Sequence, residues 1–365
     1  MSRYCKKLSE HCLLLMLSLF LFSTQSIAAD SSPAKPEGKF YGAMETEYPA
    51  WFKESFLDFN EDVADAAAAG KRLMLIFHQN GCPYCNVLVE RNLSQKDIEQ
   101  TIRKNFDAVA LNMWGSREVA SIGGQTYTEK TFAAALKVQF TPTIMFFNEQ
   151  GKLVLRLNGY IPPRRFKIAL DYVSQKQETK ISYRDYTAKH LPKVVGAKSA
   201  KGKLHNEEFF AAEPYDLTRN NKNRKPIAVF FEQKDCPNCD TLHKQVLVDK
   251  GVRKTIKDFT AIQLDMWSDT EVITPAGNKT TAKQWAKKLD IKYAPTMIVF
   301  DSTGKEIIRS EAFFKVFHTQ GILTYVSSGR YKKQPSFQRY LADLAHEIQA
   351  SGKDVDIWHL EGDAK

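Results

Sequence analysis

The stretch LMLIFHQNGCPYC, residues 73–85, joins a short apolar run to a pair of cysteines, and IAVFFEQKDCPNC, residues 227–239, repeats this arrangement. Each run of consecutive apolar residues is typical of a buried β-strand. Each strand is followed by a C-x-x-C motif with proline after the first cysteine, Cys82-Pro83-Tyr84-Cys85 and Cys236-Pro237-Asn238-Cys239. The duplicated unit predicts two copies of one fold.

The duplication extends well beyond the cysteine motifs. Between residues 111–160 and 264–313, 16 of 50 positions are identical. Within each copy the sequence predicts the same order of elements: strand, cysteine pair, helix, strand, helix, proline, β-hairpin and closing helix. Each copy is therefore a whole domain, and a chain of 365 residues has room for two domains of about 150 residues.

The N-terminus has the features of a secretory signal peptide. Basic residues within 3–7 precede the apolar run 13–22, and small residues follow within 26–29. This ten-residue run is much shorter than the roughly 20 residues that cross a bilayer. We therefore expect a cleaved signal peptide, a periplasmic location and no stable membrane insertion.

The composition is that of a soluble globular protein. Hydrophobic residues make up 43% of the chain and charged residues 26%, which argues against a disordered, collagen-like or multi-span membrane protein. A net charge of +10 would fit nucleic acid or an anionic membrane surface. Because an exported protein rarely meets nucleic acid, we expect no nucleic-acid partner.

A basic stretch separates the two copies. Residues 189–203 carry five lysines, and no acidic residue occurs between Tyr186 and Asn206. Such a stretch is typical of a solvated linker. The predicted organisation is a signal peptide at 1–29, a flexible leader at 30–44, a first domain at 45–192, a basic linker at 193–205, a second domain at 206–350 and a C-terminal tail at 351–365.

The four cysteines that follow the signal peptide fit thiol–disulfide exchange. A C-x-x-C motif at a helix start places its first sulfur at the positive end of the helix dipole, where a thiolate is stabilised. The second sulfur lies close enough to resolve a mixed disulfide. We therefore expect Cys82 and Cys236 to attack, and Cys85 and Cys239 to resolve. Proline-containing pairs at helix starts are poor zinc ligands, so we expect no metal and no cofactor.

A proline follows the second helix of each copy, about 60 residues after the cysteines. Only about 5% of X-Pro bonds are cis in folded proteins, but the recurrence of Pro142 and Pro295 at matching places favours a cis bond at both. Such a bond would bring the backbone of Thr141 or Ala294 beside the sulfurs. We expect these four residues to form the edge on which an extended client peptide binds.

These features together resemble the thioredoxin fold, and within it the SoxW-type thioredoxin-related group. The resemblance covers 45–190 and 206–348, and the stretches that carry it are 51–56, 66–77, 111–115, 140–143 and 231–233 with the cysteine pair that follows. It implies an α/β fold of two tandem domains, each with a central mixed sheet flanked by helices.

The resemblance also implies a function. It implies periplasmic thiol–disulfide exchange, protein clients with disulfides, and a membrane electron carrier that recharges the dithiols. It favours a reductase. The alternatives are a disulfide oxidase or isomerase, or a redox-silent binding or adaptor role for one of the two domains.

Each copy lacks the buried acid that thioredoxins usually have on the strand before the cysteines. Ile76 and Phe230 occupy its position. His78 and Glu232 lie four residues before the attacking cysteines and are candidate substitutes, although a polar residue at such a position more often faces solvent. The proton acceptor for the resolving cysteines is therefore not assigned by the sequence.

The residue before the first cysteine also differs between the copies. It is Gly81 in the first and Asp235 in the second. A neighbouring negative charge disfavours a thiolate, so Cys82 is expected to have the lower pKa of the two attacking cysteines. Trp114 and Trp267 occupy matching positions after a strand, where we expect core or edge packing in preference to a place in a client groove.

Overall fold

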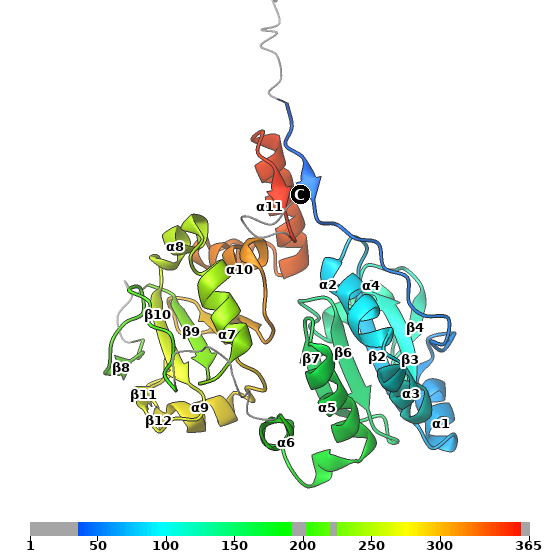
Figure 1. Ribbon diagram of the computed structural model, residues 1–365. Coiled ribbons are helices and arrows are strands. Elements are labelled where there is room, and N and C mark those ends of the chain that lie inside the picture. Colours follow the sequence, from blue (N-terminus) through cyan, green and yellow to red (C-terminus); the bar gives the residue numbers. More distant parts are fainter. Residues whose placement is uncertain (1–35, 192–201, 220–224, 359–365) are drawn as a thin grey trace, which may run out of the picture. The chain divides into compact units, whose positions relative to one another are not determined.

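The computed structural model describes residues 36–191, 202–219 and 225–358. The predicted signal peptide and most of the predicted linker lie outside these residues. The elements form two similar sets, which we call repeat one (residues 45–191) and repeat two (residues 202–350). Each repeat is built on a four-stranded sheet with helices packed against it (Figure 1). The predicted α/β class, with a mixed sheet flanked by helices in each domain, is confirmed.

In repeat one the central strand lies between a parallel and an antiparallel neighbour. The strand order is β3-β2-β6-β7, with β2 parallel to β3 and antiparallel to β6. Residues 73–77 of β2 are apolar and fully buried, so both faces of the sheet are covered. The strands are β2 (Arg72–His78), β3 (Phe106–Asn112), β6 (Thr143–Phe147) and β7 (Leu153–Asn158), with a separate hairpin of β4 (Glu118–Ala120) and β5 (Thr126–Thr128).

The alternation of side chains along β2 divides the core of repeat one in two. Met74 and Ile76 pack with α3 and α5, whereas Leu73, Leu75 and Phe77 pack with α1 and α4 on the other face. The helices are α1 (Phe59–Ala68), α2 (Pro83–Val87), η1 (Leu88–Leu93), α3 (Lys96–Asn105), α4 (Glu129–Ala135), α5 (Pro163–Ser174), η2 (Gln177–Thr179) and α6 (Tyr183–His190).

Repeat two has the same topology. Its strand order is β10-β9-β13-β14, and β9 is again parallel to one neighbour and antiparallel to the other. The strands are β9 (Ile227–Glu232), β10 (Thr260–Asp265), β13 (Thr296–Phe300) and β14 (Glu306–Ser310), with a small second sheet of β8 (Tyr215–Asp216), β11 (Glu271–Ile273) and β12 (Lys279–Thr281). The helices are α7 (Pro237–Thr241), η3 (Leu242–Val246), α8 (Lys250–Ile256), α9 (Ala282–Lys288), α10 (Val316–Ser327), η4 (Arg330–Lys332) and α11 (Phe337–Ala350).

Two segments outside the repeats pair with each other. β1 (Phe40–Tyr41) lies parallel to β15 (Val355–Asp356), so part of the predicted flexible leader and part of the predicted tail share a short ladder. The sequence gives no sign of this contact, because two-residue strands have no periodicity to detect.

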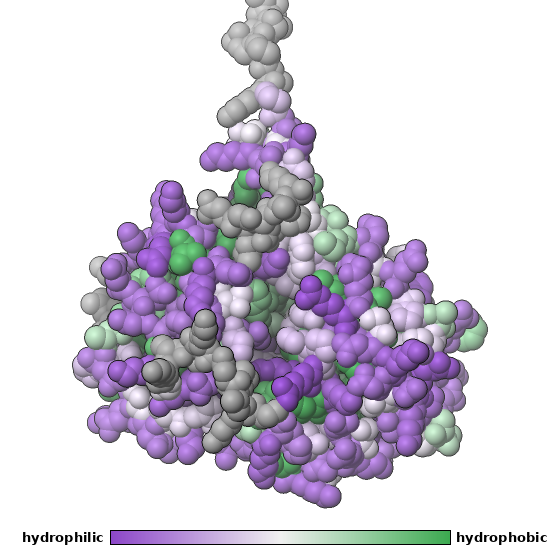
Figure 2. Space-filling view, in the orientation of Figure 1, coloured by the Kyte–Doolittle hydropathy of each residue, from purple (hydrophilic) through white to green (hydrophobic). Residues whose placement is uncertain are grey.

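The surface is largely polar. Figure 2 shows one face on which hydrophilic residues predominate and apolar residues occur in small separate patches. Among the described residues the exposed large hydrophobic side chains are Phe40, Phe56, Leu153 and Val248. Within the same residues, no helix has the length and apolar character to cross a membrane.

Candidate redox sites

The cysteine pairs lie where the central strand of each sheet ends and a helix begins. α2 starts directly after Cys82, and α7 directly after Cys236. Proline is the first residue of both helices, where its missing N–H leaves no helical hydrogen bond unmade. Both pairs form disulfides, and in each the first sulfur accepts a hydrogen bond of 3.1 Å from the backbone N–H of the second cysteine. After reduction, the same N–H group would stabilise a thiolate on the first cysteine.

The first cysteine of each pair lines a groove. Cys82 lines one of about 600 Å³, the first groove, and Cys236 lines one of about 730 Å³, the second groove. Cys85 and Cys239 are 0% and 1% exposed and line neither groove. A client disulfide therefore meets Cys82 or Cys236 first, while the second cysteine of the pair is shielded until it resolves the complex.

The residues before the two prolines lie against the attacking sulfurs. The bonds Thr141–Pro142 and Ala294–Pro295 are both cis. Cys82 Sγ is 3.6 Å from the carbonyl oxygen of Thr141, and Cys236 Sγ is 3.5 Å from that of Ala294. The Thr141 hydroxyl also donates to Cys82 Sγ at 3.3 Å, a contact that alanine cannot make in repeat two. The structure thus gathers the predicted site residues into two matching groups.

The two matching tryptophans are half-buried and line the grooves, although the sequence favoured core or edge packing. The indole N–H of Trp114 donates to Gln79 Oε1 at 2.8 Å, and that of Trp267 donates to Gln233 Oε1 at 3.1 Å. These bonds fix the rings at the groove walls, where they offer apolar surface to a client.

Repeat two supplies part of the wall of the first groove. The Tyr84 hydroxyl accepts a hydrogen bond of 3.0 Å from the backbone N–H of Lys315, which directly precedes α10. The rings of Phe314 and His318 lie 5.5 and 5.2 Å from the Tyr84 ring. Burial lowers the pKa of His318 to about 4 and raises that of Tyr84, so both side chains are neutral at physiological pH.

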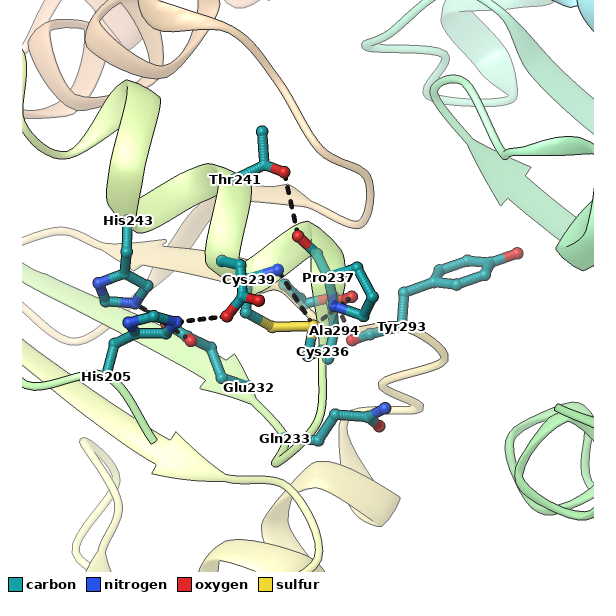
Figure 3. Close-up of a disulfide and its surroundings, with 12 residues drawn as sticks. His205, Glu232, Gln233, Cys236, Pro237, Cys239, Thr241, His243, Tyr293 and Ala294 are labelled. Carbon is teal, nitrogen blue, oxygen red and sulfur yellow. Dashed lines mark hydrogen bonds and ion pairs between the residues drawn. A yellow bond between two sulfur atoms is a disulfide. The ribbon is translucent and has the colours of Figure 1, made fainter. Parts of the chain in front are cut away.

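Repeat two contains a buried charged cluster beside its dithiol (Figure 3). Glu232, at the end of β9, is fully buried, so the expectation that this position faces solvent is wrong. His243 Nε2 lies 3.0 Å from a Glu232 oxygen, and its Nδ1 lies 2.9 Å from Glu207. Burial alone would lower the pKa of His243, but the hydrogen bonds and charges of Glu232 and Glu207 outweigh it, and the pKa is raised. The two carboxylates therefore favour the protonated, cationic form of His243.

The cluster has further partners around this core. Arg253 donates to Glu207 at 2.8 Å, and the ring of His205 stacks on His243 at 4.4 Å. His205 in turn lies 2.6 Å from Asp240, the residue directly after Cys239. Acidic and basic side chains therefore alternate from Glu232, beside the dithiol, through His243 and Glu207 to Arg253 on α8.

Repeat one has no counterpart of this cluster. His78 and Val89 occupy the positions of Glu232 and His243. Burial lowers the pKa of His78, which favours a neutral ring, and that ring lies 5.0 Å from the Tyr48 ring. The two dithiols therefore have different electrostatic surroundings.

The sequence analysis did not identify most of this cluster, because its members come from β9, η3, α8 and the segment before β8, and no local motif marks them. It also did not show that repeat two contributes to the first groove. The one available signal for the cluster was a histidine, His243, at helical spacing with the apolar Val246 and Leu247, which follow it by three and four positions.

The residue before each attacking cysteine supports a first prediction. Gly81 and Asp235 both have positive φ, 69° and 53°, which suits glycine better than aspartate. Replacing Asp235 by glycine removes a negative charge beside Cys236, so alkylation of Cys236 at neutral pH should become severalfold faster. Iodoacetamide labelling of reduced protein that carries Cys82→Ser and Cys85→Ser measures this rate.

Asp235→Asn is the matched control, because asparagine keeps the size and tolerates positive φ while removing only the charge. It should give most of the acceleration. Alkylation rates that do not change in either variant would show that this carboxylate does not influence the thiolate.

Comparison with known proteins identifies the family. A family model described as a thioredoxin-like domain matches residues 59–174 and 214–321, which together make up more than half of the chain. Among solved structures, a thioredoxin-fold protein from Helicobacter pylori is 26% identical, with 33% of this chain and 80% of that chain covered and a TM-score of 0.30. A thioredoxin from Thermus thermophilus is 22% identical, with 38% and 89% covered and a TM-score of 0.28.

A disulphide isomerase from Xylella fastidiosa Temecula1 is 16% identical, with 31% of this chain and 80% of that chain covered and a TM-score of 0.23. Among curated proteins, no sequence matches the chain. The family model matches both repeats, and each matched region contains a C-x-x-C disulfide. The chain belongs to the thioredoxin-like domain family and is a thiol–disulfide oxidoreductase with one cysteine pair in each of two tandem repeats.

Proposed function

We propose that this protein reduces disulfides of client proteins in the periplasm, and that each repeat does so with its own dithiol. The observation that carries the proposal is the same in both repeats: the first sulfur lines a groove beside the backbone that precedes a proline, while the second is sealed from solvent. This arrangement places one sulfur at the groove wall and holds its resolving partner in reserve behind it.

The exchange follows from these positions. In the reduced repeat, the Cys82 or Cys236 thiolate attacks one sulfur of the client disulfide; the client S–S bond breaks and a mixed disulfide forms. The client's other sulfur leaves as a thiolate and takes up a proton. Cys85 or Cys239 then loses its proton and attacks the mixed disulfide, which releases the second client thiol. Two electrons pass from the dithiol to the client, and the repeat is left oxidised.

The backbone beside each sulfur provides the binding edge. The carbonyl oxygens of Thr141 and Ala294 lie next to the attacking sulfurs, where an extended client chain could add hydrogen bonds along the edge. Trp114 and Trp267 add apolar surface in the same grooves. We expect the peptide around the client disulfide to bind there in an extended form.

The proposal also includes export of the protein to the periplasm and re-reduction of its dithiols. The basic, apolar and small-residue segments of positions 1–29 support a cleaved signal peptide and a periplasmic location. Continued reduction in an oxidising compartment requires a supply of electrons, for which a membrane electron carrier is proposed on the resemblance to SoxW-type proteins.

The direction of electron flow is tested by equilibrating the protein with reduced and oxidised glutathione. A reductase should have potentials near that of thioredoxin, about −270 mV, whereas disulfide isomerases and oxidases lie between roughly −180 and −120 mV. Insulin reduction with dithiothreitol as electron donor should be accelerated in parallel. Potentials above about −200 mV would instead favour the oxidase or isomerase.

A further inference from the structure

The second groove is lined by many cationic side chains. Arg164 and Arg165 come from the start of α5, and Arg184 comes from α6, all in repeat one. Lys234 and Lys292 of repeat two also line it. The lining contains two carboxylates against these five cations, those of Asp235 and Asp265.

The acidic residues near this groove leave the arginines unneutralised. Asp265 Oδ1 accepts from the backbone N–H of Trp267 at 3.0 Å, and Lys292 is paired with Asp290 at 2.6 Å. In the described part of the chain, neither Arg165 nor Arg184 has a carboxylate within ion-pair distance. A positive charge taken out of water without a partner is costly, which favours an anion supplied by a ligand.

The geometry of the two arginines supports the same reading. Arg184 is 6% exposed, donates to the carbonyl oxygen of Met266 at 2.8 Å, and lies 4.1 Å from the centre of the Trp267 ring. Its Nε is buried and has no hydrogen-bond partner among the described residues. Arg165 lies 5.6 Å from the centre of the Tyr293 ring. Burial is the main cause that lowers the pKa of both guanidinium groups, so little water surrounds their charges.

The first groove is an internal control for this feature. The residues that line it include no lysine, arginine, aspartate or glutamate. Its ring side chains are Phe40, Tyr84, Trp114, Phe314, Phe317, His318 and His346. Two grooves with the same sulfur chemistry therefore differ mainly in charge.

We infer that repeat two selects disulfides whose neighbouring residues carry carboxylates, and that repeat one has no such preference. The inference rests on the proposed exchange activity and adds a substrate class to it. The occupant of the second groove is an acidic peptide segment of a client protein, whose carboxylates meet Arg165 and Arg184 while its disulfide reaches Cys236. Repeat two thus prefers acidic clients, whereas repeat one accepts clients whatever their charge.

The test uses the full chain with one dithiol removed at a time. Cys82→Ser with Cys85→Ser leaves repeat two active, and Cys236→Ser with Cys239→Ser leaves repeat one active. Three peptide disulfides that differ only in having glutamate, glutamine or lysine next to the cysteines are the substrates. For repeat two, kcat/KM should be roughly fivefold or more higher with glutamate than with glutamine, and the difference should shrink at high salt. For repeat one, the three peptides should react within about twofold of each other.

Variants connect this preference to the groove. Arg165→Gln and Arg164→Gln should lower the glutamate-to-glutamine ratio of repeat two towards one. Arg103→Gln, on the surface of α3 and paired with Glu99, is the matched control and should leave the ratio unchanged. Glutathione disulfide, which also carries carboxylates, tests whether a small molecule is the substrate of repeat two. Faster turnover of the glutamate peptide than of glutathione disulfide would identify a polypeptide as the substrate.

The outcomes separate the inference from the proposed function. Equal rates on the glutamate and glutamine peptides, in a chain that reduces both, would overturn the charge selectivity and leave the exchange activity standing. If neither repeat reduces any peptide, the proposed function fails. In that case, fluorescence anisotropy with peptides in which serine replaces cysteine still tests the charge selectivity. Tighter binding of the glutamate peptide than of the glutamine peptide supports the selectivity, and equal binding overturns it.

Discussion

Replacing Cys82 and Cys236 together by serine should lower the rate of disulfide reduction by at least about a thousandfold, because the attacking thiolates are lost and a serine hydroxyl is not ionised near neutral pH. Each single replacement should instead leave the activity of the other repeat. Both cysteines are 3% exposed and pack among apolar residues, so serine of similar size should preserve the fold. Insulin reduction by the purified full chain measures the rates, and circular dichroism checks the fold.

Replacing the resolving cysteines should give a different result. Cys85→Ser and Cys239→Ser should retain attack but stall at the mixed disulfide, so clients accumulate as covalent complexes on Cys82 and Cys236. Non-reducing gels with peptide or protein clients detect these complexes. If loss of the Cys236–Cys239 pair changes neither the rate nor the trapped clients, repeat two is a binding module and only repeat one is an enzyme.

Features set by nearby residues could be predicted from the sequence. The buried strand, the cysteine pair and the helix that follows are contiguous, and apolar runs and proline positions mark them. The sequence also placed Pro142 and Pro295 beside the cysteines, since their recurrence identified one topology used twice. The structure shows these elements with small shifts at their ends: β2 begins at Arg72, one residue before the apolar run that starts at Leu73, and ends at His78.

Features that depend on contacts between residues far apart in the sequence could not be predicted from local patterns. Glu232 can be buried because His243, from a different element and itself paired with Glu207, lies against its carboxylate. The sequence of β9 alone does not distinguish a buried carboxylate at this position from one that faces solvent. Likewise, Arg184 reaches the second groove from the other repeat, 52 positions before Cys236 in the sequence. Neither the grooves nor their charges follow from a local pattern.

Replacing His243 by leucine should lower the free energy of unfolding by about 3 kcal/mol, because the fully buried Glu232 would lose the cation that compensates its charge. Adding Glu232→Leu should restore most of this loss, since two apolar side chains can pack where the ion pair lay. Urea denaturation of the oxidised full chain measures both changes. The exposed Lys244, the neighbour of His243 on η3, changed to leucine, is the matched control and should alter stability by less than about 0.5 kcal/mol.

The double variant decides whether charge compensation is the cause. If Glu232→Leu adds its own loss to that of His243→Leu, the two residues act independently and the cluster stabilises the repeat by packing alone. Recovery in the double variant shows instead that an uncompensated carboxylate produced the loss. No second substitution is expected to restore a loss of stability in this way for the Asp235 or cysteine variants, because none of them leaves a buried charge without its partner.

The stability difference between the natural chain and His243→Leu should depend on pH. The pKa of His243 is raised in the folded state, so its contribution is fully present below the unfolded value of about 6.5 and is lost as pH rises through the higher folded value. The charged or polar groups that face this ring are Glu232 on β9, Glu207 before β8, Gln263 on β10, and His205, which stacks on it; Arg253 and Asp240 act through Glu207 and His205. The difference should therefore be larger at pH 6 than at pH 9 in urea titrations. A difference that grows towards pH 9 would mean that His243 is neutral between its two carboxylates.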